Sequence, residues 1–296
     1  MQIAIFNKYP TKETLSLTRG IISFLTTKNA TILLNKELAR SLNLSKKYPV
    51  FTSFVNKKNI PDFFVSIGGD GSILESITRI ANAEIPIIGI NTGRLGFLSI
   101  IKKEDYKESL ENIINGNYKI ESRALLNLKT RTNLYGNLNF ALNEITINRK
   151  DSTSMITIKT YLNNEYLNTY WADGLIISTP TGSTGYSLSC GGPIVMPKSE
   201  NFIITPVAPH NLNARPFVIP DDYEITLKVE GRSKNFLVTL DSRVETFNSS
   251  LELVVSKENF NAKLVKIQGQ NYSSTLRNKL LWGVDKRNQS FPSINY

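Results

Sequence analysis

Apolar and polar positions alternate in two rhythms along the first third of the chain, one typical of strands and one of helices. Thr11–Thr26, the residues after Ser72 and Glu104–Asn115 have apolar side chains at helical spacing, and Gly116 stands where a helix often ends. The short apolar runs between these segments predict strands at Gln2–Phe6, Ala30–Leu34, Phe63–Ile67 and Pro86–Ile90. Strands that alternate with helices predict an α/β fold with a parallel sheet covered on both faces.

From about Tyr118 the helical spacing gives way to short strand-like runs. They lie at Leu125–Thr130, Leu142–Asn148, Met155–Leu162, Leu175–Ser178, Ile203–Val207, Glu224–Val229, Phe236–Leu240 and Leu251–Val255. Helical spacing returns only around Ser274–Leu281. We therefore expect a Rossmann-like α/β domain over residues 1–118, a β-rich domain over 119–270 and a tail over 271–296 that returns to the first domain.

Composition excludes several classes of protein. The 296 residues are 41% hydrophobic and 20% charged, which are ordinary globular values, so a disordered chain is excluded. One cysteine, Cys190, and one histidine, His210, exclude a disulfide framework and zinc sites built from several such ligands. No apolar run reaches the roughly 18–20 residues of a membrane helix. Met1–Pro10 lacks the layout of a signal peptide, and we expect the protein to be located in the cytoplasm.

The net charge of +10 favours anionic partners in general. The basic residues form scattered pairs rather than a block, so charge alone does not choose among these partners. Neither nucleic acid nor a membrane is expected as a partner.

The first candidate for chemistry is the turn Gly68-Gly69-Asp70-Gly71-Ser72, which joins a buried strand to a helix. Its glycines let the backbone approach a ligand closely, and amides at a helix start attract phosphate oxygens. Gly68, Gly69, Gly71 and Ser72 are therefore a candidate loop for a phosphate donor. Asp70 would accept a proton from an attacking hydroxyl or hold a metal ion. The alternative is a tight turn with Asp70 or Ser72 as a helix cap.

The second candidate is the hydroxyl-rich segment Asp173–Ser189, in which a strand leads into a loop of Ser, Thr and Gly. Hydroxyl groups both donate and accept hydrogen bonds, which suits base edges and ribose hydroxyls, and Tyr186 could stack on a purine. The alternative is a structural turn capped by Thr181 or Ser183. Two weaker candidates are Asn143-Glu144, which could bind a diol, and the turn Asn91–Leu98.

Together these segments resemble the NAD kinase family. The matching residues are GGDGS at 68–72, NTGRLGFL at 91–98, NE at 143–144, DGLIISTPTGSTGYSLSCGGPIV at 173–195, APH at 208–210 and LRNKLLWG at 276–283. The glycine turn is shared with diacylglycerol and sphingosine kinases and with phosphofructokinases, whereas the 173–195 segment is highly specific. The resemblance covers residues 60 to 283 in the family order.

The resemblance implies phosphorylation of the adenosine ribose 2′-hydroxyl of NAD to give NADP. ATP or polyphosphate would be the donor, with a divalent metal cation, expected to be Mg²⁺, and the chain would form a homodimer or homotetramer. Asp70 would be the catalytic proton acceptor. The implied NAD-binding residues are Gly71, Phe97, Asn143, Glu144, Trp171, Asp173, Thr181, Thr184, Gly185, Tyr186, Ser187, Leu188, Ser189, Ala208 and Arg243.

Two positions depart from the family pattern. Gly185 stands where alanine is common, and Asp241-Ser242-Arg243 stands where Asp-Gly-Gln is common. Arg243 could contact a phosphate, so Arg243→Gln would selectively weaken binding of the more phosphorylated ligand. His210 is assigned no role.

Two other functions remain open at this point. A diacylglycerol-type lipid kinase shares the glycine turn, but it should lack the hydroxyl-rich segment. A non-catalytic NAD(P) sensor would bind the dinucleotide, but it has no need of Asp70 between its glycines. Neither the donor preference, nor acceptance of NADH, nor feedback by NADP follows from the sequence.

Overall fold

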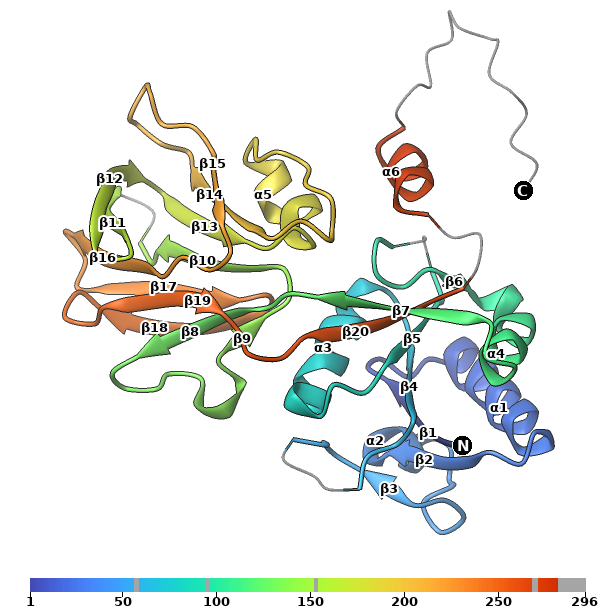
Figure 1. The fold of residues 1–296 in the computed structure, drawn as a ribbon. Coiled ribbons are helices and arrows are strands. Elements are labelled where there is room, and N and C mark those ends of the chain that lie inside the picture. The colour runs from blue at the N-terminus through green and yellow to red at the C-terminus, as the bar shows by residue number, and fades with distance from the viewer. Residues whose placement is uncertain (56–58, 94–95, 152–153, 268–270, 282–296) are drawn as a thin grey trace, which may run out of the picture.

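The computed structural model describes residues 1–55, 59–93, 96–151, 154–267 and 271–281, whose strands form three sheets (Figure 1). The first sheet has the strand order β3-β2-β1-β4-β5-β20-β7, with β6 beside β5. All its pairs are parallel except the antiparallel pair of β20 with β7. The strands are β1 (Gln2–Asn7), β2 (Thr31–Asn35), β3 (Val50–Phe51), β4 (Phe63–Ile67), β5 (Ile87–Asn91), β6 (Ile101–Lys102), β7 (Tyr118–Arg123) and β20 (Ala262–Ile267).

Helices cover both faces of this sheet, as the sequence predicts. One face packs on α1 (Lys12–Thr27), α2 (Lys36–Ser41) and α4 (Tyr106–Ile114), and the other on α3 (Asp70–Ile80). Successive side chains of a strand point to opposite faces, so Phe63 and Val65 of β4 join the first core and Phe64 joins the second. A Thr11–Thr14 capping box fixes the start of α1.

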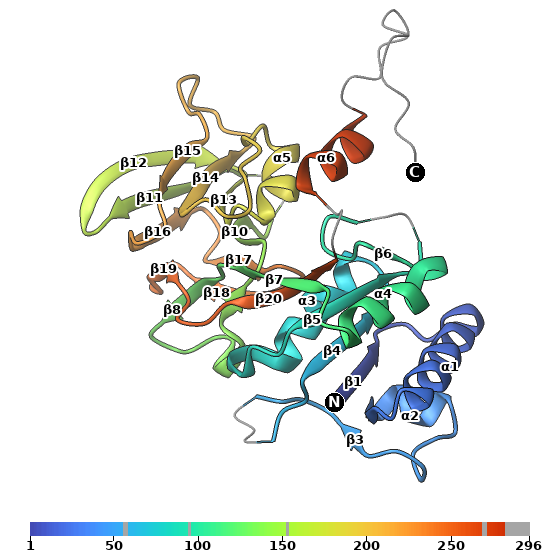
Figure 2. The same ribbon diagram turned by 45° about the vertical axis from the view of Figure 1, so that its right-hand side comes forward.

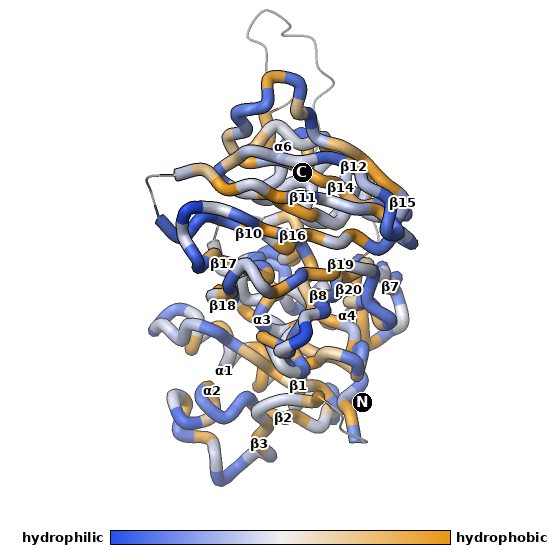
Figure 3. The backbone as a smooth tube through the Cα atoms, turned by 90° about the vertical axis from the view of Figure 1, so that its left-hand side faces the viewer, coloured by the Kyte–Doolittle hydropathy of each residue, from blue (hydrophilic) through white to orange (hydrophobic). Residues whose placement is uncertain are grey.

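The other two sheets are antiparallel and enclose one hydrophobic core between them. One contains β15 (Phe217–Pro220), β14 (Asn201–Val207), β13 (Gly174–Ser178), β10 (Glu144–Arg149), β17 (Asn235–Leu240) and β18 (Arg243–Asn248). The other contains β12 (Glu165–Ala172), β11 (Ile156–Leu162), β16 (Ile225–Gly231), β19 (Leu253–Lys257), β8 (Leu126–Thr130) and β9 (Phe140–Ala141). Figure 3 shows hydrophobic stretches on these strands and hydrophilic ones at the turns. The expected α/β and β-rich fold class is thus confirmed.

The sequence analysis did not predict β3, β6, β7, β9, β12, β15, β18 and β20. Among them, β12 and β18 lie at the edges of their sheets. Polar residues interrupt the apolar ones in both of these edge strands, so neither has the apolar run that marks a buried strand. The helix expected at Ser274–Leu281 is α6 (Tyr272–Leu280). The part of the expected tail beyond residue 281 lies outside the described residues. None of the helices in the described part of the chain is long and apolar enough to span a membrane.

The first sheet is completed by a strand from far along the chain. In the sequence, β20 comes after all the strands of the two antiparallel sheets, and it lies between β5 and β7 of the first sheet (Figures 1 and 2). The core beneath α3 also spans both parts, because Ile73 and Ile77 of the helix share it with Leu125, Phe140 and Leu142. This shared core places the start of β10, and the residues before it, beside α3.

Candidate functional site

The glycine turn after β4 leads directly into α3. Gly68 has a φ of 140°, which favours glycine, and a Cβ there would lie 2.2 Å from the Ser72 hydroxyl oxygen. Gly69 is the N-cap and provides no side-chain cap, and the space beside Gly69 and Gly71 is open within 4 Å. The predicted phosphate-donor loop is therefore an uncapped start of an eleven-residue helix with room above its amides.

Asp70 joins this turn to the 91–98 segment. Its carboxylate accepts hydrogen bonds from the backbone N–H groups of Phe97 (2.8 Å), Leu98 (3.0 Å) and Ser99 (2.9 Å). The Ser99 hydroxyl also donates to the carbonyl of Gly68 at 2.9 Å. These contacts bring two of the predicted motifs together, although Arg94 and Leu95 of the second motif lie outside the described residues.

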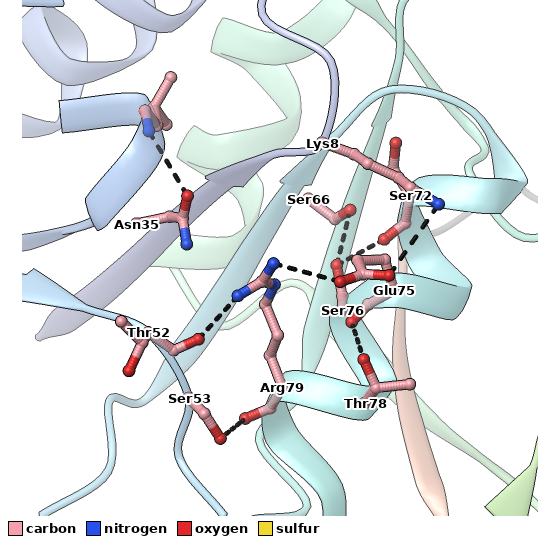
Figure 4. A network of polar contacts seen from close by, with 11 residues as sticks. Lys8, Asn35, Thr52, Ser53, Ser66, Ser72, Glu75, Ser76, Thr78 and Arg79 are labelled. Carbon is pink, nitrogen blue, oxygen red and sulfur yellow. Dashed lines mark hydrogen bonds and ion pairs between the residues drawn. The ribbon is translucent and has the colours of Figure 1, made fainter. Parts of the chain in front are cut away.

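Beside the turn, α3 carries a polar network (Figure 4). The Ser76 hydroxyl contacts the Ser66 hydroxyl at 2.9 Å and the Ser72 carbonyl at 2.7 Å, which ties the helix to β4. Glu75 pairs with Arg79 at 3.1 Å, and Lys8, after β1, lies 3.9 Å from the other oxygen of Glu75. Lys8 extends over the first turn of α3 in the close view.

Asn143 directly precedes β10 and Glu144 is its first residue, and the half-buried carboxylate of Asp241 binds the backbone of both. Asp241 accepts hydrogen bonds from the N–H groups of Leu142 (2.9 Å), Asn143 (2.8 Å) and Glu144 (3.2 Å). Asp241 has a φ of 52°, in the left-handed region that aspartate tolerates better than most residues. The sequence analysis noted Asp241 only as a preserved family position and gave it no role.

The hydroxyl-rich loop after β13 rests on Asn143 and Glu144. Thr179 donates its N–H to the Asn143 carbonyl (2.9 Å) and its hydroxyl to the Leu142 carbonyl (2.6 Å). A Cβ on Gly182 would lie 2.1 Å from the Asn143 carbonyl oxygen, so this close approach requires glycine. A Cβ on Gly185 would lie 3.0 Å from the Glu144 carboxylate. Contacts between residues 36 to 41 positions apart thus join the two motifs into one surface.

Glu144 is a strongly perturbed carboxyl group in this surface. Burial, reinforced by the charge of Asp241, raises the pKa of Glu144 to about 8, and a backbone hydrogen bond from Tyr186 only partly opposes this. Among the described residues its Oε2 atom is buried without a hydrogen-bond partner. Strongly perturbed carboxyl groups of this kind are typical of functional sites.

Within the loop, side chains divide between packing and exposure. Ser187 is buried and exchanges a 2.8 Å hydrogen bond with Thr205, so its hydroxyl is used inside the protein. Tyr186 is 42% exposed, and Ser189 is also exposed. Thr184 and Leu188 are half-buried. The ring of Tyr186 is therefore accessible for the predicted stacking on a purine.

The remaining predicted residues lie farther along the second sheet and its neighbours. Asp173 pairs with Arg149 at 2.9 Å, and Trp171 is 53% exposed. Ala208 is exposed and has a φ of 44°. Arg243 donates to the carbonyl oxygens of Leu138 and Phe140, so its guanidinium has partners within the chain and its contact with a ligand phosphate stays a prediction.

One further side chain at this surface was missed entirely. The buried Arg123 at the end of β7 donates to the Thr181 hydroxyl at 3.3 Å. Its sequence context has no motif that marks it. Among the described residues, no group of three His, Cys, Asp or Glu side chains could hold a metal ion.

Comparisons with known proteins agree with this geometry. Residues 3–118 match the family model for the ATP-NAD kinase N-terminal domain, and residues 142–267 match that for the C-terminal domain. An NAD kinase from Flavobacterium johnsoniae is 49% identical over 294 residues, covering 97% of this chain and 100% of that one. One from Cytophaga hutchinsonii is 55% identical over 240 residues, covering 80% of this chain and 82% of the other.

Two solved structures have the same fold. An Archaeoglobus fulgidus NAD kinase in complex with ATP has a TM-score of 0.75 and 25% identity, covering 95% of this chain and 99% of that one. The yeast NADH kinase complexed with NADH has a TM-score of 0.83 and 22% identity, covering 100% of this chain and 90% of that one.

Proposed function

The chain belongs to the NAD kinase family, and from this premise we propose which of its residues bind each substrate and move the proton. The protein is a phosphotransferase with an alcohol acceptor: it transfers a phosphoryl group from ATP to the adenosine ribose 2′-hydroxyl of NAD, giving NADP. Because the chain belongs to this family of enzymes, neither a lipid kinase nor a non-catalytic sensor is proposed.

The observation that best supports the residue roles is the close packing of the hydroxyl-rich loop against Asn143 and Glu144. Gly182 and Gly185 approach these two residues so closely that hydroxyls, an amide and a carboxyl group share one surface. Such a set of groups can bind ribose hydroxyls and a base edge together. We assign the dinucleotide to this surface, with Tyr186 stacking on the adenine and Asp173, Trp171 and Ala208 at its border.

Asp70 is the proposed proton acceptor. A carboxylate offers about four acceptor positions, and three N–H groups fill three of them here. The remaining one is free for the ribose hydroxyl. As the hydroxyl oxygen bonds to the terminal phosphorus, the bond from that phosphorus to the leaving phosphate breaks, and the hydroxyl proton passes to Asp70. Phe97, adjacent to this carboxylate, would wall the pocket.

The donor phosphates are assigned to the uncapped start of α3 at Gly68, Gly69, Gly71 and Ser72. Alignment and charge neutralisation carry most of phosphoryl transfer, and the amides provide both. A divalent cation, Mg²⁺, would be held here chiefly by the oxygens of the donor phosphates. The carboxylate at this turn, Asp70, already accepts three hydrogen bonds and has little capacity left for a metal ion. The cation would neutralise phosphate charge there.

Other properties are proposed from the family resemblance. We expect a homodimer or homotetramer in the cytoplasm, with polyphosphate as a second donor. We also keep the division into an α/β domain over 1–118, a β-rich domain over 119–270 and a tail from 271, with β7 and β20 contributed to the first sheet.

A donor-by-acceptor matrix tests the function. The purified protein with Mg²⁺ is given ATP, another triphosphate or polyphosphate against NAD, NADH or diacylglycerol, and NADP is followed with a coupled dehydrogenase. We expect NADP from NAD and ATP. Phosphorylated lipid, or tight NADP binding without turnover under every donor and metal, would contradict the proposal.

A further inference from the structure

Arg123 is one of the largest fully buried side chains of the protein, with 2% of its surface exposed. One terminal nitrogen donates to the Thr181 hydroxyl at 3.3 Å. The other donates to Glu121 on the same strand at 2.7 Å, and Lys266 of β20 approaches the same carboxylate oxygen at 3.0 Å. A single guanidinium thus links the first sheet to the hydroxyl-rich loop.

The charges around Arg123 do not balance. Burial opposes ionisation of Glu121, but the charges and hydrogen bonds of Arg123 and Lys266 outweigh it and hold the pKa of Glu121 below its usual range. One carboxylate therefore faces two cations. Among the described residues the Nε atom of Arg123 is also buried without a partner. Buried, unpartnered donors are rare enough in folded proteins that each one calls for a reason.

The start of α6 lies near this part of the protein. Burial raises the pKa of Tyr272, the first residue of α6, and the charge of Arg123 partly opposes the rise. Among the described residues the Tyr272 hydroxyl is buried without a hydrogen-bond partner. Figure 2 shows α6 next to α5 (Tyr186–Ser189), the short helix that ends the hydroxyl-rich segment.

The effect of the Arg123–Thr181 hydrogen bond depends on the part of the loop that follows Thr181. Thr181 stands directly before the turn Gly182–Thr184, whose Thr184 hydroxyl donates to the Thr181 carbonyl at 3.3 Å. Because Gly182 already touches Asn143, a shift at Thr181 would move the loop relative to Asn143 and Glu144. Removing the tie at Thr181 would therefore disturb the surface assigned to the dinucleotide, but not the start of α3.

We propose that Arg123 is a positioning residue for the dinucleotide: by holding Thr181 against the first sheet, it fixes the hydroxyl-rich loop in the arrangement that binds NAD. This inference rests on the proposed function. Arg123 does not touch the substrate; it acts through Thr181.

The test is a double-mutant cycle of Arg123→Lys and Thr181→Val, read by calorimetric binding of NAD without a donor and by KM values. Lysine keeps the charge but lacks the planar fork that reaches two partners. We expect Arg123→Lys to weaken NAD binding about three- to tenfold, with the KM for ATP within about twofold of wild type. The double variant should bind NAD no more weakly than the weaker single one.

Matched controls are Thr160→Val, at a buried threonine of β11 whose hydroxyl has no partner among the described residues, and Arg40→Lys, at an exposed arginine. Both should bind NAD as the wild type does. A lower melting temperature with unchanged NAD affinity in Arg123→Lys, or single losses that multiply in the double variant, would overturn the inference. If Arg123→Lys fails to fold, Thr181→Val with Arg123→Gln completes the cycle. A wild type that does not bind NAD would instead overturn the proposed function.

Discussion

A Cβ atom on Gly96 would lie 1.8 Å from the Oδ1 atom of Asp70. The carboxylate thus occupies space that exists only because residue 96 has no side chain. The N–H groups that follow Gly96 bind the same carboxylate, so the loop and the proposed proton acceptor fix each other. The orientation of Asp70 is therefore a property of two segments rather than of the helix that carries it.

Gly96→Ala should lower kcat by at least about tenfold, because a displaced reacting group loses alignment with its substrate. The matched control is Gly93→Ala in the same loop, where an added Cβ meets nothing within 4 Å. Steady-state kinetics and thermal unfolding of both variants check this. Equal kcat values in the two variants would show that the loop does not set the position of Asp70.

Asp70→Asn should leave NAD binding largely intact and lower turnover by roughly two to four orders of magnitude, the usual contribution of a positioned base. The variant should also melt at a lower temperature, because the new amide turns an N–H group toward an N–H donor of the loop. Turnover within a factor of about three of wild type would remove Asp70 from its role. NAD affinity, measured by calorimetry, separates lost chemistry from lost folding.

Stability should depend on the ionisation of Glu144. Its pKa is about 8 in the folded protein, against a usual value of 4.5. The folded state therefore binds this proton more tightly, so the stabilisation is full below about pH 4.5 and is lost as pH rises through 8. Glu144→Gln, which mimics the protonated form, should gain melting temperature relative to wild type as pH increases across this range.

Glu165→Gln, at an exposed glutamate on β12, is the control for the same titration. Its melting temperature should follow that of wild type at every pH. A constant difference between Glu144→Gln and wild type from pH 5 to pH 9 would mean that Glu144 is ionised throughout and that the burial argument is wrong.

Two glycines of the hydroxyl-rich loop should differ in their tolerance of alanine. At Gly182 the new Cβ would meet a backbone carbonyl at 2.1 Å, which cannot move without displacing the backbone around Asn143. At Gly185 it would meet the Glu144 carboxylate at 3.0 Å and the Gly182 carbonyl oxygen at 3.1 Å, contacts that shifts of a few tenths of an ångström relieve. Gly182→Ala should therefore weaken NAD binding by at least about tenfold and Gly185→Ala by less than about threefold. Comparable losses in calorimetry would contradict this assignment.

The sequence predicted those parts of the fold and site that are encoded locally. Phe63–Ile67 is a strand in both the prediction and the structure, and the glycine turn after it leads into a helix as expected. The edge strand β12 escaped prediction, because polar residues interrupt its apolar ones and its pairing is decided by distant residues. Local pattern is a strong signal where a strand is almost entirely apolar, as in β4, or alternates regularly, as in β11.

Side chains that act over long sequence distances were beyond prediction for the same reason. Asp241 binds the backbone at residues 142–144, 97 or more positions earlier, and Arg123 reaches Thr181 across 58 positions. The guanidinium of Arg243 donates to the carbonyls of residues 138 and 140, which its sequence context did not indicate, and its contact with a ligand phosphate stays a prediction. Hydrogen-bond partners of a long side chain depend on the assembled fold.

The insertion of β20 between β5 and β7 has a consequence for biosynthesis. While the ribosome is still translating the middle of the gene, β5 has only the two-residue strand β6 on that side, and β7 has no strand to pair with until residues 262–267 emerge. The first sheet therefore cannot be completed before nearly all of the chain has been translated. A nascent chain stalled before residue 262 would expose an open sheet edge to chaperones and proteases.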